Sequence, residues 1–400
     1  MKYIVVLGDG MADNPLEELD GKTPLEYART PVMDELAAKG VVGLAHTIPE
    51  GMSPGSDTAN LAVLGYNPRV YYTGRSPLEA LSIGVPLKET DIALRCNLVT
   101  VSEENTAYES RTILDHSSGE ISTEDAAVLL DAVRQELENE EYRFYVGTSY
   151  RHLTVWDNGS VVDLVPPHDI LGKRIGGYLP KEDALRRMME KSYEILNHHP
   201  INEARAGEGK NKANSLWFWG AGTRPALTSF EEKTGKRGVM ISAVDLLKGI
   251  AIGAGMKVVE VEGADGTLHT NYEGKAAAAV DALLNQGFDF AYVHVEAPDE
   301  MGHQGSTERK VKAIEYLDTR VIRVVKEKMD ASGEPYRLLI TPDHPTPLAL
   351  RTHVAEPVPF LIYDNTRERK RIGRYNEKEA KQSGIVIENG YELMEQFLSV

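Results

Sequence analysis

The stretch FDFAYVHVEAPDEMGHQG, residues 288–305, decides the fold of this chain. Its first part is apolar and aromatic, which is the composition of a buried strand. That strand must end by Pro298, because proline cannot continue a ladder of backbone hydrogen bonds. Asp299 and His303 come directly after it, in what we expect to be a loop. Because loops at the carboxyl ends of strands carry the chemistry of α/β sheets, the stretch predicts an α/β fold with a metal-binding pair. On its own it is equally compatible with a solvated turn.

The totals of the chain set limits on its class. Its 400 residues exceed one ordinary core and predict two domains. The net charge of −17 argues against nucleic acid and against an anionic membrane as partners, but a local basic pocket could still bind a small anionic substrate. The single cysteine, Cys96, excludes an intramolecular disulfide and fits a reducing compartment. With no secretory h-region and no apolar run of membrane-spanning length, we expect a cytoplasmic protein.

Two further strand-like runs end in carboxylates. The β-branched run 3–7 leads to Asp9, which stands between two glycines that allow another group to approach closely. The apolar run 337–340 leads to Asp343 and His344, and His353 follows nine residues after His344. Any one of these aspartates could instead be an ordinary turn residue.

Ser56 follows a loop rich in glycine and proline and precedes a helical pattern that begins near Leu61. A helix N-terminus favours an anion, through its unpaired N–H groups and the helix dipole. Serine at this place is most often only an N-cap. It becomes a candidate nucleophile if something such as a metal ion lowers its pKa.

From about Pro86 the pattern changes to short alternating runs with two helical stretches among them. We interpret residues 89–207 as a small α+β module inserted into a larger domain formed by residues 1–88 and 208–400. The module carries several cationic or potentially cationic side chains, each of which could simply be solvated or paired. These are Arg111, Arg151, His152, His168 and Arg174.

The carboxylates and histidines form a set that matches one kind of chemistry. Two divalent ions in an open catalytic site need about three protein ligands each, with room for substrate. Two such ions, about 3.5–4 Å apart, can clamp the attacking and leaving oxygens of an in-line phosphoryl transfer. One of them could also hold Ser56 as an alkoxide. The six Asp and His ligands of this set are Asp9, Asp299, His303, Asp343, His344 and His353.

Five motifs together carry a family resemblance. They are DGMAD, PGSDTANLAVLGYNP, PDEMGHQG, TPDHPTP and RTHVAEPVPF. In this order they resemble the cofactor-independent phosphoglycerate mutases of the alkaline phosphatase superfamily, most closely the short, archaeal-type branch. The resemblance covers essentially the whole chain. It implies an alkaline-phosphatase-like, open, mostly parallel sheet flanked by helices, with an inserted α+β cap domain.

The resemblance also implies an activity. Ser56 would take the phosphoryl group from one hydroxyl of glycerate and return it to the neighbouring one, which interconverts 3-phosphoglycerate and 2-phosphoglycerate without bisphosphoglycerate. The two metal ions would usually be manganese, with zinc or magnesium possible. The implied ligands are Asp299, His303 and His353 for one ion and Asp9, Ser56, Asp343 and His344 for the other.

The inserted module would close over the site as a cap and supply groups that bind substrate. This role carries over loosely to Arg111, Arg151 and His152. Arg75 and Lys210 are secondary candidates for gripping phosphate or carboxylate. A cap favours a mutase over a hydrolase, because the phosphoserine must be kept from water.

Asn60 is a departure from the longer bacterial form, which has a histidine four residues after the nucleophile. Any acid/base role at this position is therefore in doubt.

Three alternatives stay open. One is a phosphohydrolase of the same superfamily, which would release inorganic phosphate. Another is a phosphotransferase resembling homoserine kinase, although the chain has no GxxxxGK[ST] phosphate loop. The third is a metal-binding protein without activity, which is disfavoured because every implied ligand position holds a competent residue type.

Overall fold

The computed structural model describes residues 1–367 and 373–399. These residues form two compact units, which we call unit 1 and unit 2. Unit 1 combines Met1–Tyr72 with Ala226–Val400, and unit 2 is Thr73–Pro225. A larger domain interrupted by a smaller one is therefore the organisation of the chain.

The unit boundaries lie further out than residues 89 and 207, the predicted limits of the module. Strand β7 (Ser215–Thr223) pairs antiparallel with β3 (Ile92–Val101) of unit 2, and α5 (Arg75–Ser82) packs against both strands. The apolar run at 215–219 predicts a strand, but a strand pattern does not reveal its pairing partner. Both elements consequently belong to unit 2 rather than to the larger domain.

Unit 1 contains an eight-stranded sheet. Strands β9, β8, β10, β1 and β11 are parallel, β12 is antiparallel to both of its neighbours, and β13 is parallel to β2. The predicted open, mostly parallel sheet is confirmed. Its strands, in order across the sheet, are β13 (Val386–Ile387), β2 (Val41–Ala45), β12 (Val358–Asp364), β11 (Tyr336–Thr341), β1 (Lys2–Gly8), β10 (Phe290–Val295), β8 (Gly238–Ile241) and β9 (Lys257–Val258).

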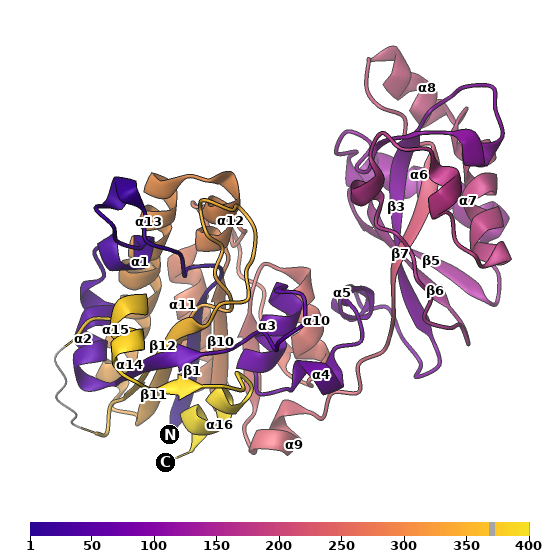
Figure 1. Ribbon diagram of the computed structural model, residues 1–400. Coiled ribbons are helices and arrows are strands. Elements are labelled where there is room, and N and C mark those ends of the chain that lie inside the picture. Colours follow the sequence, from indigo (N-terminus) through magenta and orange to yellow (C-terminus); the bar gives the residue numbers. More distant parts are fainter. Residues whose placement is uncertain (368–372, 400) are drawn as a thin grey trace. The chain divides into compact units, whose positions relative to one another are not determined.

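Helices cover both faces of this sheet (Figure 1). Successive side chains of a strand point to opposite faces, so Ile4 and Val6 of β1 face one layer and Val5 and Leu7 face the other. The layer on the Ile4 side supplies one large apolar core. Its helices are α2 (Pro31–Lys39), α11 (Tyr272–Asn285), α13 (Thr307–Tyr316) and α14 (Arg323–Ser332).

The opposite face of the sheet meets a second layer of helices. The Tyr292 hydroxyl of β10 donates to Asn60 of α3, and Tyr3 of β1 stacks edge-on against Phe397 of α16. This layer therefore brings α3 against the middle of the sheet. Its helices are α3 (Ser56–Val63), α9 (Phe230–Thr234), α10 (Asp245–Gly253) and α16 (Glu392–Leu398).

Apolar residues at helical spacing over 309–329 predict a helix, and it is present with one irregularity. A π-helical segment, Leu317–Ile322, joins α13 to α14. Within it the buried Asp318 carboxylate accepts the N–H groups of Val32 and Met33 in the first turn of α2. Unit 1 also has short elements, α1 (Pro24–Tyr27), α4 (Pro68–Tyr71), α12 (Ala297–Gln304), α15 (Glu377–Gln382) and a 3-10 turn at Glu17–Leu19.

Unit 2 is built on a separate antiparallel sheet with strand order β4, β3, β6, β5. Strand β7 also pairs with β3, along the edge opposite β6. The sequence has four short alternating runs here, each typical of a strand. Those at 93–99, 142–146 and 152–156 lie in strands, but the one at 161–165 lies outside every strand. Cys96 is a buried, free cysteine on β3. The remaining elements are β4 (Ile113–Asp115), β5 (Tyr142–Thr148), β6 (Arg151–Trp156), α6 (Thr123–Leu137), α7 (Asp183–Leu196), α8 (Pro200–Gly207) and 3-10 turns at Tyr108–Ser110, Pro167–Ile170 and Ile175–Tyr178. Across 1–367 and 373–399, no helix has both the length and the apolar character of a membrane span.

Glu377 makes the stability of unit 1 sensitive to pH. Burial raises the pKa of its carboxyl to about 7, although the Thr23 hydroxyl and the Asp13 N–H both donate to it. A carboxyl whose pKa is raised in the folded state stabilises the fold fully at pH values below its unfolded-state pKa, about 4.3. This contribution to the free energy of unfolding is lost as the pH rises through about 7. We therefore expect Glu377→Gln to remove a stability loss of about 3 kcal/mol across this window.

The measurement is the free energy of unfolding of wild type and Glu377→Gln at a series of pH values. Replacement of the exposed Glu17 by glutamine is the matched control and should follow wild type. A constant difference between wild type and Glu377→Gln across the window would contradict the buried, protonated carboxyl.

Candidate metal centre

The three carboxylates that follow strands meet at one edge of the unit 1 sheet. Strand β1 lies between β11 and β10 and is parallel to both. Asp9 directly follows β1, Asp343 lies just after β11, and Asp299 lies in α12 just after β10. Gly10 has a φ of +59°, and a Cβ there would lie 2.5 Å from Asp299 Oδ1. The bare backbone at Gly10 thus allows Asp299 to come close to Asp9, as the glycines around Asp9 suggested.

Asp299 and His303 lie on a helix and not in the predicted loop. Pro298 ends the strand pattern as expected, but proline is also favoured in the first turn of a helix, and α12 begins at Ala297. Residues four apart share one face of a helix. The His303 Nε2 atom consequently lies 3.2 Å from Asp299 Oδ2.

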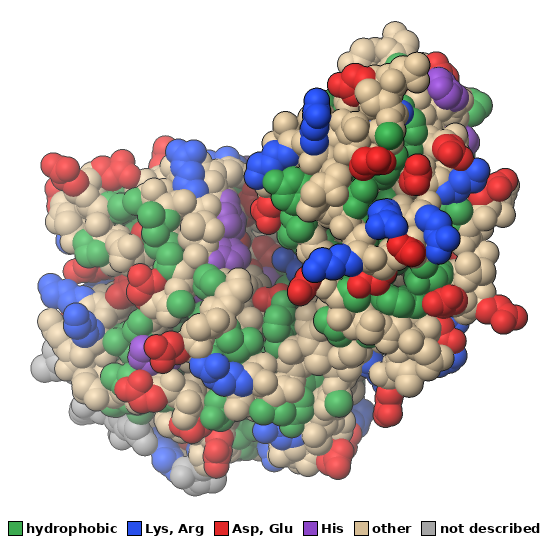
Figure 2. All heavy atoms as spheres, turned by 45° about the vertical axis from the view of Figure 1, so that its right-hand side comes forward, with side chains coloured by type: hydrophobic (Ala, Val, Ile, Leu, Met, Phe, Trp, Pro, Cys, Tyr) green, Lys and Arg blue, Asp and Glu red, His purple; other side chains and the backbone are tan. Residues whose placement is uncertain are grey.

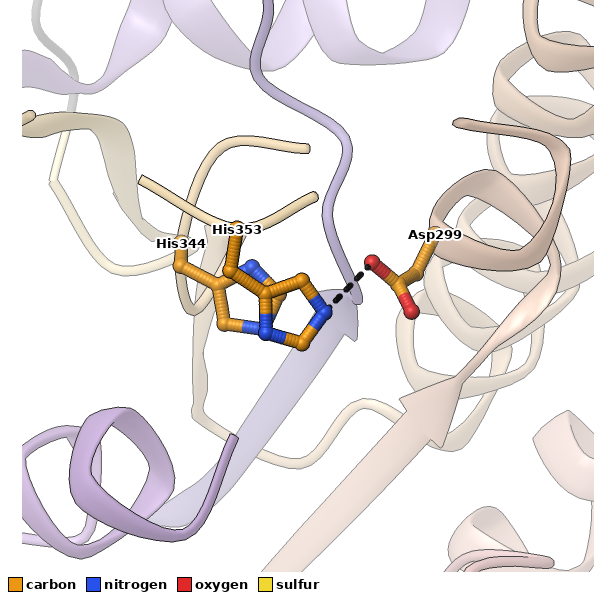
Figure 3. A group of neighbouring side chains, drawn as sticks. All are labelled: Asp299, His344 and His353. Atoms are coloured by element: carbon orange, nitrogen blue, oxygen red, sulfur yellow. Dashed lines mark ion pairs between the residues drawn. The ribbon is translucent and has the colours of Figure 1, made fainter. Parts of the chain in front are cut away.

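His353 completes a group with Asp299 and His303. Its Nε2 lies 3.3 Å from Asp299 Oδ1 and 3.0 Å from His303 Nε2. The dashed line in Figure 3 marks the pair of His353 and Asp299. The Nδ1–H of His353 donates to the Pro54 carbonyl, and that of His303 to the Arg351 carbonyl. Because a carbonyl only accepts, each Nδ1 carries the proton and both Nε2 atoms converge on one point. This is the arrangement that histidine ligands of metals adopt.

His344 lies beside this group and faces the second set of oxygens. Its ring stacks on that of His353 with centroids 3.8 Å apart. Its Nε2 lies 3.5 Å from Asp9 Oδ1 and 3.3 Å from Asp343 Oδ2. The same atom lies 3.0 Å from the hydroxyl of Ser56. His344 therefore links the two halves of the cluster.

Ser56 is the first residue of α3, directly after Gly55. Its hydroxyl is thus placed at the positive end of the helix dipole, next to a group of acidic ligand atoms. Asn60, one turn later, donates from its amide nitrogen to the Ser56 carbonyl and to Asp343 Oδ2, at 2.8 and 2.9 Å. This side chain fixes the start of α3 against Asp343.

The carboxylates differ in how far their oxygens are already paired. Asp343 Oδ1 accepts the N–H groups of Gly10 and His344, and Oδ2 accepts from Asn60. Asp9 Oδ1 is buried and has no hydrogen-bond partner among the described residues. Burial and the nearby charges of Asp343 and Asp299 raise the pKa of Asp9 well above its ordinary value. An unpaired, buried acceptor beside two other carboxylates fits a cation, which would relieve both costs.

The pKa values of two of the histidines are shifted in opposite directions by their surroundings. The hydrogen bond and the charge of Asp299 raise the pKa of His303 to about 9. Burial lowers the pKa of His344, so that its ring is neutral at neutral pH. The partly exposed His303 and His353 side chains keep the first group open to solvent. Histidine side chains (purple) gather in a patch on the surface in Figure 2.

Among the described residues, ligand atoms converge in two groups, Asp299 with His344 and His353, and Asp9 with His294 and Asp343. The resemblance places His344 with Asp9 and Asp343, and its Nε2 is close enough to both carboxylates for that assignment.

His294 is a site residue that the sequence reasoning missed. It lies on β10, in the apolar run that was interpreted only as a buried strand, and it contacts Asp9. The available signal was an imidazole inside an apolar strand, since a buried polar ring needs partners. The partners of the ring are Asp9 after β1, Ser242 after β8 and Glu296 directly after β10.

Two of the candidate substrate-binding residues, Arg111 and His152, are buried inside unit 2. Arg111 is buried, donates to the carbonyls of Ser102 and Glu104, and stacks on the Tyr193 ring. Burial lowers the pKa of His152 to about 4, so its ring is neutral at neutral pH.

The other three candidates are at the surface of unit 2. Arg151 is exposed on β6. Arg75 pairs with Glu79 at 3.0 Å, and Lys210 pairs with Glu208 at 2.6 Å. Their substrate-binding role stays a prediction.

Comparison with known proteins identifies relatives of the chain. Residues 37–202 match the family model of 2,3-bisphosphoglycerate-independent phosphoglycerate mutase. The chain is 50% identical over 403 residues to a probable 2,3-bisphosphoglycerate-independent phosphoglycerate mutase of Geobacter sulfurreducens, covering 100% of both chains. It is 51% identical over 368 residues to the enzyme of that name from Methanosarcina acetivorans, covering 91% of this chain and 90% of the relative.

Two solved structures extend the match to the fold. The PH0037 protein from Pyrococcus horikoshii is 31% identical, with a TM-score of 0.81 over 99% of this chain and 96% of that one. The cofactor-independent phosphoglycerate mutase from Thermoplasma acidophilum is 26% identical, with a TM-score of 0.68 over 100% and 99% of the two chains. The chain therefore belongs to the family of 2,3-bisphosphoglycerate-independent phosphoglycerate mutases.

Proposed function

We propose that this mutase interconverts 3-phosphoglycerate and 2-phosphoglycerate through a phosphoserine at Ser56, in a centre that holds two divalent cations. The observation that carries the proposal is the position of the Ser56 hydroxyl, 3.0 Å from His344 Nε2 within a cluster of carboxylates and histidines. A hydroxyl in a polar cluster at a helix N-terminus is suited to receive a phosphoryl group.

The ligands present fit two cations. The acidic cluster, the orphan Asp9 Oδ1 and the Nε2 atoms directed by backbone carbonyls all favour bound metal. When bound, the cations would supply charge stabilisation to the phosphoryl oxygens and lower the pKa of the Ser56 hydroxyl. We assign Asp299, His303 and His353 to one ion and Asp9, Ser56, Asp343 and His344 to the other. Carboxylate oxygens suit manganese and magnesium, and imidazoles suit zinc; we propose manganese, with zinc or magnesium as alternatives.

The residues of the chain give the steps their order. Ser56 Oγ loses its proton and attacks the phosphorus, the bond between phosphorus and the glycerate oxygen breaks, and that oxygen takes up a proton to become a hydroxyl. The phosphoserine lies at the positive end of α3, which favours its negative charge. The neighbouring hydroxyl of the same glycerate then attacks the phosphorus, and Ser56 is released. No bisphosphoglycerate is needed, because the phosphoryl group never leaves the site.

Asn60 orients groups in this scheme and transfers no proton. Its amide holds the Ser56 carbonyl and Asp343 Oδ2, while its oxygen accepts from the Tyr292 hydroxyl. An amide cannot serve as a general base, which supports a purely geometric role for Asn60.

The phosphoserine must also be protected from water until the glycerate has reacted. We propose that unit 2 acts as the cap that excludes water, with Arg75, Arg151 and Lys210 as candidate contacts for the anionic substrate. If water were admitted, the same centre would act as a phosphatase.

The test is incubation with 3-phosphoglycerate and Mn²⁺, without bisphosphoglycerate, followed by phosphorus NMR. We expect 2-phosphoglycerate at equilibrium and little inorganic phosphate. Accumulation of free phosphate would support the phosphohydrolase alternative. Product formed only with ATP and homoserine would support the kinase-like alternative, and no turnover of any of these substrates would contradict the proposal.

A further inference from the structure

A buried chain of four charged side chains lies behind the metal centre. It runs from Asp9 through His294 and Glu296 to Lys275. The exposed fractions of these side chains are 6%, 0%, 7% and 0%. Isolated charges are costly to bury, so each must be held by its neighbours. Apart from Asp9, none of them belongs to the metal ligands assigned above.

In this series of four side chains, the end that lies away from the metal centre fixes the direction of the hydrogen bonds. Lys275 can only donate, and its Nζ lies 2.6 Å from Glu296 Oε2 and 2.8 Å from the His294 carbonyl. Glu296 Oε1 accepts the Ala243 N–H at 2.9 Å and lies 3.2 Å from His294 Nδ1. Glu296, ionised through its pair with Lys275, can only accept. His294 Nδ1 also lies 3.1 Å from the Ser242 hydroxyl, which donates its own hydrogen to Glu296 Oε1 at 3.3 Å. Both neighbours of Nδ1 can therefore accept, and Nδ1 carries a proton.

The near end of the chain faces Asp9. His294 Nε2 lies 3.0 Å from Asp9 Oδ2, which is the distance of a direct hydrogen bond. When Asp9 is ionised, as it must be to bind a cation, a lone pair on Nε2 would leave two acceptors facing each other in a buried site. A doubly protonated ring satisfies both contacts and balances two cations, Lys275 and His294, against two carboxylates, Glu296 and Asp9.

The two oxygens of Asp9 are thereby made unequal. Oδ2 is taken by His294, whereas Oδ1 has no hydrogen-bond partner in the described ranges and lies 3.5 Å from His344 Nε2. We propose that His294 is a positioning residue that holds Asp9 Oδ2, so that Asp9 presents Oδ1 alone to a cation, and that Glu296 and Lys275 lock His294 in place. This inference rests on the two-cation centre of the proposed function.

The competing assignment makes His294 itself a ligand. Its ring nitrogen lies within 4.8 Å of ligand atoms of Asp9 and Asp343, and a histidine ligand often donates its other N–H to a carboxylate such as Glu296. The two assignments differ in what happens when the ring is removed. Loss of a ligand abolishes one ion site, whereas loss of a positioning residue weakens metal affinity by about 10–100-fold.

The experiment titrates Mn²⁺ into metal-free wild type, His294→Gln, His294→Leu and Glu296→Gln by calorimetry, with electron paramagnetic resonance on protein labelled with ¹⁵N-histidine. We expect all four to bind two ions, with one ion weakened by about 10–100-fold in His294→Leu. His294→Gln, which keeps one neutral donor, should be weakened less. The nitrogen couplings of bound Mn²⁺ should not change, and kcat should fall without a change in KM. His269→Gln, which replaces an exposed histidine of unit 1, is the matched control.

Each of the other possible results would contradict one part of the proposal. Complete loss of one ion together with loss of a nitrogen coupling in His294→Gln would make His294 a ligand. Unchanged affinity in both His294 variants would remove the positioning role. If His294→Leu fails to fold, as judged by circular dichroism, Glu296→Gln and His294→Gln carry the test. Failure of wild type to bind Mn²⁺ would instead overturn the proposed two-cation centre. The wild-type titration is a separate measurement, so this result can be told apart from an effect of the His294 variants.

Discussion

Replacing Ser56 by alanine is expected to lower kcat for 2-phosphoglycerate formation by about 10⁴-fold or more, because a lost nucleophile removes the covalent route entirely. Among the described residues the Ser56 side chain makes its hydrogen bond with His344, at the site itself, so the fold should persist. One ion site, formed by Asp299, His303 and His353, should also persist. The measurement is phosphorus NMR of 3-phosphoglycerate with Mn²⁺, together with Mn²⁺ titration of the metal-free variant.

Ser53→Ala is the matched control, since Ser53 lies in the same loop but is exposed. It should retain wild-type activity. Isolation of wild type after mixing with substrate, acid quenching and peptide mass analysis should find the phosphoryl group on Ser56. A Ser56→Ala variant that keeps more than about one hundredth of the wild-type kcat would rule out the phosphoserine route.

The fold was largely readable from the sequence because parallel strands leave a distinctive record. Continuous apolar runs such as 3–7 and 337–340 mark strands buried on both faces. Since the carboxyl ends of parallel strands share an edge, the residues after them come together, and Asp9, Asp299 and Asp343 do so. The same reasoning could not assign 215–219 to its sheet, because the strand pattern is the same whichever sheet it joins.

The site was readable only in part, for a related reason. Residues that follow strand ends, such as Asp343 and His344, can be found by position alone. His294 lies within a strand, and its meaning depends on which strand is the neighbour of β10 and on a lysine that α11 delivers. The sequence likewise gives no sign that the Arg111 guanidinium donates its hydrogen bonds to backbone carbonyls. Such internal pairing depends on tertiary contacts that no local pattern records.

Removal of divalent cations with EDTA should reduce activity to background. The affinity of the metal-free protein for added Mn²⁺ should then depend strongly on pH. The contact with Asp299 raises the pKa of His303 to about 9, so at neutral pH its ring is protonated in the metal-free protein. A cation can use His303 only after that proton leaves. Below about pH 9, affinity at this ion site should therefore rise by roughly tenfold per pH unit from His303 alone.

The stability of the metal-free protein should change in the opposite direction. A raised histidine pKa contributes stability that is fully present below the unfolded value, about 6.5, and is lost as pH rises through about 9. Thus alkaline pH both weakens the metal-free fold and strengthens metal uptake, and the stabilisation by Mn²⁺ grows with pH. Titrations and thermal unfolding of wild type and His303→Gln test this, since the variant has no proton to displace and should show a flatter pH dependence. His46→Gln is the matched control, because the His46 side chain has the same exposed fraction as that of His303, 37%, and also faces a carboxylate, Glu388. Equal pH slopes for wild type and His303→Gln would show that the proton on His303 does not compete with the cation.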